Sequence, residues 1–138
     1  MDPRPPLGVE LLWSGDLAFG ARVGDSALVT DGKGTAGPSP MQLLVVALAG
    51  CMAADVVAIL LKGRHPLEGL RASLDGVRAD EPPRRLTSAV LQFHVTGNVP
   101  PAAVERAIQL SRDKYCSVFQ SLRPEVELSV AFEVHPNG

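Results

Sequence analysis

An almost wholly apolar run over residues 41–61 constrains the fold of this chain more than any other feature. About 20 consecutive apolar residues are enough to cross the core of a bilayer, so length alone admits a membrane span. However, Asp55 lies well inside the run, small residues are frequent in it, and the flanking segments are typical of a soluble domain. A helix that is apolar on all sides is equally suited to the buried centre of a domain or a dimer. We therefore predict a buried helix and no membrane association.

Composition and charge exclude several classes of function. A chain of 138 residues with 46% apolar and 20% charged residues fits one soluble domain over residues 1–138. A net charge of −2 gives no basic surface for nucleic acid or for an anionic membrane. Residues 1–6 lack the apolar core of a secretion signal and predict an irregular lead-in, so the expected compartment is the cytoplasm. Because thiols are kept reduced there, a transient disulfide is expected rather than a structural one.

Segments of alternating apolar residues lie on both sides of the long run. Those before it, separated by turn residues, predict a three-stranded meander over residues 9–13, 17–23 and 27–30. In the loop that follows, Ser39 is placed to cap the long helix, with Pro40 at its first position and Gln42 at its third.

The second half of the chain predicts further strands and helices. Strands are expected over residues 70–75, 89–95 and 126–134. A helix is expected to begin at Pro100-Pro101, and a shorter helical segment over about residues 114–122. The order β-β-β-α-β-β-α-α-β describes a single α+β domain.

The only two cysteines, Cys51 and Cys116, are the first candidates for chemistry, although a free cysteine is more often a small buried apolar side chain. Cys51 lies midway along the long helix, where the helix dipole does not lower its pKa, so its activation needs a cation from another element. Cys116 follows Arg112 and Lys114 at the predicted start of the shorter helix, where cations and free amides favour a thiolate. Local features thus favour Cys116 as the more acidic thiol.

Two other side chains bear on the cysteines. Asp55 lies one helical turn after Cys51, and a carboxylate raises the pKa of a nearby thiol, so we expect it to pair with a basic residue or with the backbone. Arg22, on the polar face of the predicted meander, is the most attractive cation for Cys51, while an ordinary solvated arginine is an equally good interpretation.

A zinc site is an alternative use of the cysteines. It would combine both thiolates with one histidine, from the set His65, His94 and His135. The spacings match no standard zinc pattern, and the alternation of its strand places His94 on the surface. We therefore predict no metal and no other cofactor.

Two motifs around the cysteines are more specific than either cysteine alone. The first covers residues 37–44 and 47–51, and the second comprises Gly97, residues 105–108, Ser111 and residues 114–118. In this order, and with flanking strands that extend the match over nearly the whole chain, they resemble the central helix and the second cysteine of the OsmC/Ohr family.

The resemblance implies both a fold and an activity. Members of the family are intertwined homodimers in which two long apolar helices pack at the centre and β-sheets wrap around them. Characterised relatives reduce organic hydroperoxides. In this chain Cys51 would then be the thiolate that attacks the peroxide, and Cys116 would resolve the resulting sulfenic acid as a disulfide that an external dithiol reduces. No metal, flavin or haem is implied.

The sequence departs from the family pattern near the start of the long helix. Family peroxidases hold the reactive thiolate with an arginine that a glutamate orients, whereas this chain has Met41 and Gln42 there. At about 100° per residue, Met41 lies about 80° around the helix from Cys51 and Gln42 nearly opposite it. Arg22 is in the right part of the chain for the arginine.

Three hypotheses about function follow. The first is an OsmC-like hydroperoxide reductase. The second is an OsmC-like protein that binds a small apolar ligand or transfers thiols, with little peroxidase activity, which the missing glutamate favours. The third, a purely structural module, requires the two sulfurs to be far apart.

Overall fold

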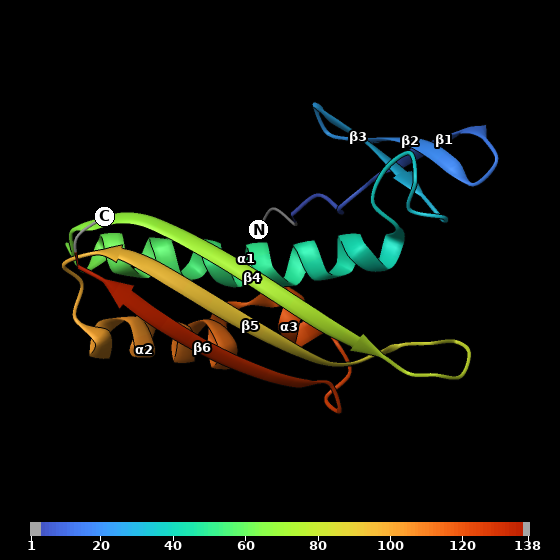
Figure 1. The fold of residues 1–138 in the computed structure, drawn as a ribbon. Coiled ribbons are helices and arrows are strands. Elements are labelled where there is room, and N and C mark those ends of the chain that lie inside the picture. Colours follow the sequence, from blue (N-terminus) through green and yellow to red (C-terminus); the bar gives the residue numbers. More distant parts are fainter. Residues whose placement is uncertain (1–3, 137–138) are drawn as a thin grey trace. The chain divides into compact units, whose positions relative to one another are not determined.

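The computed structural model of this chain describes residues 4–136 (Figure 1). Its elements are β1 (Glu10–Gly15), β2 (Ala18–Val23), β3 (Ser26–Asp31), α1 (Pro40–Lys62), β4 (Leu67–Arg78), β5 (Leu86–Gly97), α2 (Pro101–Leu110), a π-helical turn (Ser111–Tyr115), α3 (Ser117–Ser121) and β6 (Glu127–His135). The predicted α+β order is confirmed. Of the predicted lead-in, residues 1–3 lie outside the described residues, and residues 4–9 form no helix or strand.

The chain divides into two compact units, with the boundary after Leu44. The first unit holds the predicted meander, an antiparallel sheet in the order β1-β2-β3. Asp31 ends β3 with a buried carboxylate that accepts hydrogen bonds from the backbone N–H groups of Lys33 and Ala36 and from the Thr35 hydroxyl. These bonds stabilise the ionised form and lower the pKa of Asp31 to about 2. The loop that leads toward α1 is thereby fixed in shape.

The start of α1 is capped as its sequence predicts. The Gln42 backbone N–H donates to Ser39 Oγ, and the Ser39 backbone N–H donates to Gln42 Oε1. This reciprocal capping box satisfies amides that the helix cannot pair itself. The Gln42 side chain is therefore committed to the helix start.

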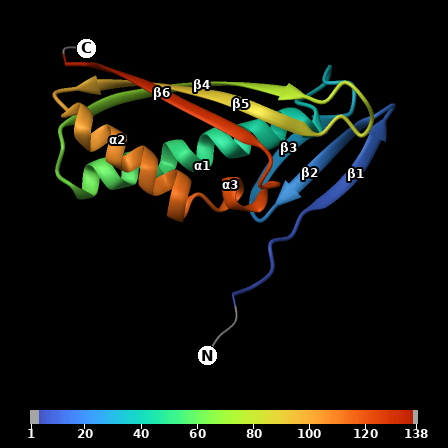
Figure 2. The same ribbon diagram turned by 90° about the horizontal axis from the view of Figure 1, so that it is seen from below.

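The second unit is a three-stranded sheet covered on one face by helices. Strand β5 is central, antiparallel to β4 and parallel to β6. Helices α1 and α2 run along the same face of this sheet (Figures 1 and 2). The side chains between the two layers form the core, which includes Phe93, Leu91, Val95, Val104 and Ile108.

Helix α1 is buried along one stripe only. Its fully or almost fully buried residues recur every fourth position: Leu48, Met52, Val56 and Leu60. This stripe packs against the sheet, so the helix that is long and apolar enough to cross a bilayer is the core helix of a soluble fold. The opposite side of the helix is apolar and exposed, and Val46 on it retains 61% of its accessible surface.

The shorter helical segment predicted over residues 114–122 begins later than expected. Helix α2 runs on into the π-helical turn, which closes when the Cys116 backbone N–H donates to the Ser111 carbonyl five residues earlier. Cys116 then has an extended backbone, and α3 starts at Ser117. Lys114 therefore belongs to the π-helical turn and not to α3. The prediction placed the start of the helix too early, because helical spacing in a sequence does not reveal the one extra residue of a π-helical turn.

Candidate active site

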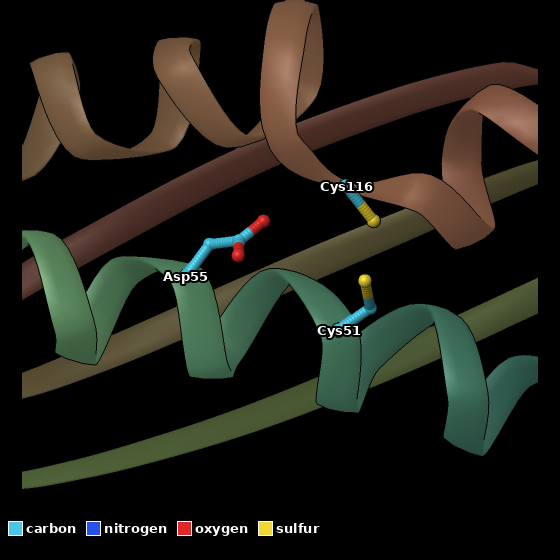
Figure 3. Close-up of side chains that lie close together, drawn as sticks. All are labelled: Cys51, Asp55 and Cys116. Atoms are coloured by element: carbon cyan, nitrogen blue, oxygen red, sulfur yellow. The ribbon is translucent and has the colours of Figure 1, made fainter. Parts of the chain in front are cut away.

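Cys51 and Cys116 lie together within the second unit. Their two Sγ atoms and a carboxylate oxygen of Asp55 are all within 4.8 Å of one another, and both cysteines are free thiols. Figure 3 shows the two sulfur atoms pointing toward each other, with the Asp55 carboxylate directed into the same space. The proximity of the sulfurs rejects the hypothesis of a structural module, which required them to be far apart.

Two separate segments of the chain supply the cysteines and Asp55. Cys51 lies beside the buried stripe of α1, and Asp55 follows one turn later on the same helix. Cys116 lies at the bend between the π-helical turn and α3, so its side chain leaves the chain toward α1. The buried Ser111 hydroxyl donates to Asp55 Oδ2 at 2.8 Å, and this bond links the two sides of the site.

Cys116 is not an acidic thiol, contrary to the expectation from its local sequence. Burial raises the pKa of Cys116 to about 11, and the nearby Cys51 and Asp55 add to this rise. The helix start does act in the expected direction, because the Phe119 backbone N–H donates to Cys116 Sγ at 3.4 Å. Burial raises the pKa of Cys116 by more than this hydrogen bond lowers it, and Cys116 is therefore a neutral thiol at neutral pH.

The cations that precede Cys116 are engaged elsewhere. Arg112 donates from Nη2 to the Leu128 carbonyl at 2.7 Å, and the Lys114 ammonium lies 5.4 Å from the centre of the Tyr115 ring. The sequence interpretation of Arg112 and Lys114 as activating charges for Cys116 is therefore wrong. Although both cations are close to Cys116 in sequence, their charged groups contact other residues.

The partner of Asp55 also differs from the prediction. Within residues 4–136 its carboxylate forms no ion pair, and it accepts its hydrogen bond from the Ser111 hydroxyl. Ser111 belongs to the second sequence motif, but the sequence indicates no role for it. Only the packing of the π-helical turn against α1 reveals that it positions Asp55.

The effect of Asp55 on Cys116 can be tested by Asp55→Asn. Because the carboxylate charge raises the pKa of Cys116, its removal should lower that pKa relative to the protein that keeps Asp55, and burial should keep it above the ordinary value. Asparagine keeps an oxygen that accepts from Ser111, so the fold is expected to persist. The measurement is thiolate absorbance against pH in a Cys51→Ser background, where Cys116 is the only thiol. An unchanged or higher pKa would show that Asp55 does not act on the sulfur.

Arg22 lies in β2, in the first unit, with an exposed side chain. In the part of the chain that the structure describes, it forms no ion pair or side-chain hydrogen bond. Its role as the cation for Cys51 remains a prediction.

The zinc hypothesis fails in the form that used a histidine beside both cysteines. The two sulfurs and the Asp55 oxygen are close enough to share one thiophilic ion. Among residues 4–136, however, no histidine joins that group, and His94 and His135 lie together with Glu133 instead.

A pocket opens beside Asp55, between α1 and α2. Its wall combines apolar side chains of Ile59 and Leu110 with the basic residues Lys62 and Arg106. An apolar lining with a few polar groups is the usual character of a small-molecule site. Asp55 is the residue that this pocket shares with the cysteine cluster.

Comparison with known proteins supports the fold and places the chain in a family. A family model described as OsmC-like protein matches residues 31–131, which include both cysteines. The chain belongs to the OsmC-like protein family. The OsmC-like protein is 41% identical over 128 residues to Protein YhfA of Escherichia coli K12, an alignment that covers 88% of this chain and 93% of YhfA.

Solved structures share the same fold. A hypothetical protein from Aquifex aeolicus superposes with a TM-score of 0.90 at 28% identity, and covers 98% of this OsmC-like protein and 100% of its own chain. The organic hydroperoxide resistance protein OhrB of Bacillus subtilis superposes with a TM-score of 0.64 at 14% identity, over 93% of this chain and 98% of its own. At that identity OhrB shows the fold alone.

Proposed function

We propose that this OsmC-like protein is a thiol-dependent peroxidase that reduces organic hydroperoxides through Cys51 and Cys116. The observation that carries the proposal is the meeting of both sulfurs within 4.8 Å beside Asp55. The family includes peroxidases, and one protein of this fold is named for organic hydroperoxide resistance.

The proposed reaction has two steps. In the first, the Cys51 thiolate attacks the distal oxygen of the hydroperoxide, the O–O bond breaks, and the alkoxide leaves as an alcohol after taking a proton. Cys51 becomes a sulfenic acid, oxidised by two electrons. In the second, the Cys116 sulfur attacks the Cys51 sulfur, water leaves, and a disulfide forms. An external dithiol then reduces that disulfide and becomes a disulfide itself.

Burial supports the order of attack. Cys116 is fully buried and its raised pKa keeps it protonated, whereas Cys51 is partly exposed. A protonated thiol is a poor nucleophile toward peroxide, but it serves as a resolving group once a base removes its proton. Asp55, the carboxylate within 4.8 Å of Cys116 Sγ, is the candidate acceptor of that proton, which leaves in the released water.

Activation of Cys51 requires a cation, and Arg22 is our proposed source. The glutamate that orients such an arginine in family peroxidases has no equivalent here, since the Gln42 side chain caps α1. That observation favours the second candidate function, an OsmC-like protein that holds a small apolar ligand or transfers thiols. The pocket beside Asp55 suits such a ligand.

The exposed apolar side of α1 leads us to propose a homodimer. Residues on that side are small or apolar, and they are left uncovered: Val46, Ala47, Gly50, Ala54, Ala58 and Leu61. A second copy of the chain that packed α1 against α1 would remove this surface from water. We also propose a cytoplasmic location, where an external dithiol is available.

The decisive experiment treats the fully reduced protein with one equivalent of cumene hydroperoxide. We expect rapid loss of two thiols per chain, a mass lower by two hydrogen atoms, and a peptide that joins Cys51 to Cys116. If both thiols survive for minutes, the peroxidase proposal fails and the ligand-binding function becomes the better one.

A further inference from the structure

Three potential metal ligands meet on the face of the sheet that points away from the cysteines. Phe93 and Val95 of β5 are fully buried against the helices, so His94 between them faces the opposite side. On the parallel neighbour β6, Glu133 is the register partner of His94, and His135 follows two residues later on the same exposed face. The register of β5 against β6 thus places all three side chains together.

Their donor atoms are spaced like the ligands of a single ion. His94 Nδ1 lies 3.4 Å from His135 Nε2, and Glu133 Oε2 lies 3.2 Å from the first nitrogen and 3.7 Å from the second. Zinc binds nitrogen and oxygen ligands at about 2.0–2.2 Å, so two ligands at the corners of its tetrahedron are about 3.3–3.6 Å apart. The three observed separations average close to that edge length.

The two rings present their nitrogens to each other. The ring planes are 14° from parallel and the centroids are 5.6 Å apart, which exceeds the nitrogen separation by about two ring radii. The two nitrogens therefore face each other directly, and they have room for one proton between them. Neutral imidazole nitrogens are also ligands for zinc and its neighbours, and an ion about 2.0–2.1 Å from both nitrogens would lie off the line between them, so each ring turns toward the ion when it binds.

The Glu133 carboxylate is available to bind such an ion. Arg71 is the register partner of His94 on β4 and shares the exposed face, yet the ion pairs of Glu133 within residues 4–136 are with the two histidines. The side chains of His94, His135 and Glu133 keep 22%, 50% and 59% of their accessible surface. An ion can therefore enter from solvent without disturbing the core.

We propose that His94, Glu133 and His135 form a binding site for one divalent transition-metal ion of the zinc class, with water in the remaining coordination position. Two imidazoles and one carboxylate suit Zn²⁺, Ni²⁺ or Cu²⁺ rather than Ca²⁺ or Mg²⁺, which prefer oxygen ligands. The ion would join β5 to β6 on the face opposite the cysteine pair. The site is independent of the peroxidase proposal, because none of its residues belongs to the cysteine cluster.

The test is titration of tag-free protein with ZnCl₂ by isothermal calorimetry. The protein carries Cys51→Ser and Cys116→Ser, which remove the thiols that would compete for zinc. We expect one ion per chain. His94→Gln, Glu133→Gln and His135→Gln in this background should each weaken binding at least about tenfold, since loss of even an outer partner of a metal ligand costs 10–100-fold.

Two matched variants control for charge and for histidine content. Glu127→Gln changes the carboxylate at the other end of the exposed face of β6, and His65→Gln removes the histidine outside the cluster. Neither should change the affinity for zinc. The imidazole nitrogen resonances of His94 and His135 should shift together on addition of zinc to the folded protein. Absence of binding, equal binding by all variants, or binding only when the cysteines are intact would overturn the proposal.

Discussion

Cys51→Ser should abolish the loss of thiols caused by hydroperoxide, whereas Cys116→Ser should leave the first oxidation step intact. Without the Cys51 sulfur there is no nucleophile that is both accessible and free of the burial that holds Cys116 protonated. The rate of peroxide consumption should fall to the uncatalysed background. In Cys116→Ser, one equivalent of peroxide should consume one thiol per chain and leave a sulfenic acid at Cys51 that dimedone traps.

The two variants control for each other because each keeps one thiol in a nearly isosteric site. Free-thiol counts and the mass of the dimedone adduct distinguish the outcomes. A dimedone adduct on Cys116 in the Cys51→Ser protein would reverse the assigned order of attack. Equal and slow reaction of both single variants would contradict peroxidase chemistry altogether, while leaving the zinc site on the far face of the sheet unaffected.

Ala54→Arg should convert the proposed dimer to a monomer. Ala54 is exposed on the apolar side of α1, so arginine there remains solvated in a single chain and becomes buried if a second α1 covers it. Burial of an unpaired charge costs several kcal/mol, and about 4 kcal/mol corresponds to a dissociation constant raised about a thousandfold. Sedimentation equilibrium of the wild type and the variant measures the change.

Ala102→Arg is the matched control, because it places the same side chain at an exposed alanine on α2, away from α1. It should sediment like the wild type. Circular dichroism checks that both variants retain their helices and strands. A monomeric wild type, or an Ala54→Arg protein that still dimerises with full affinity, would contradict the proposed packing of α1 against α1.

Where a local pattern dictates a local structure, the sequence was a sufficient guide. The Ser39–Gln42 capping box forms as expected, since it joins residues only three positions apart. The alternating stretches became strands, and residues 41–61 lie within α1. The pairing of Cys51 with Cys116 came from a resemblance to a family and not from spacing, because separation along the chain does not determine distance in space.

The environment of Cys116 shows where local reasoning fails. Its neighbours in sequence, Arg112 and Lys114, interact with Leu128 and Tyr115, while burial by distant elements sets its pKa. A pKa depends on every group within a few ångströms, and these groups come from the whole fold.

The sequence by itself thus determined an α+β fold with one long central helix, because the apolar run over residues 41–61 and the alternating stretches on both sides of it are local patterns. Only the tertiary structure decided which groups meet. The π-helical turn and the bend after it place Ser111 and Cys116 beside Asp55 and Cys51. The register of β5 against β6 places His94 beside Glu133 and His135. Both sites join residues from separate elements, and such contacts arise from packing that no short stretch of sequence contains.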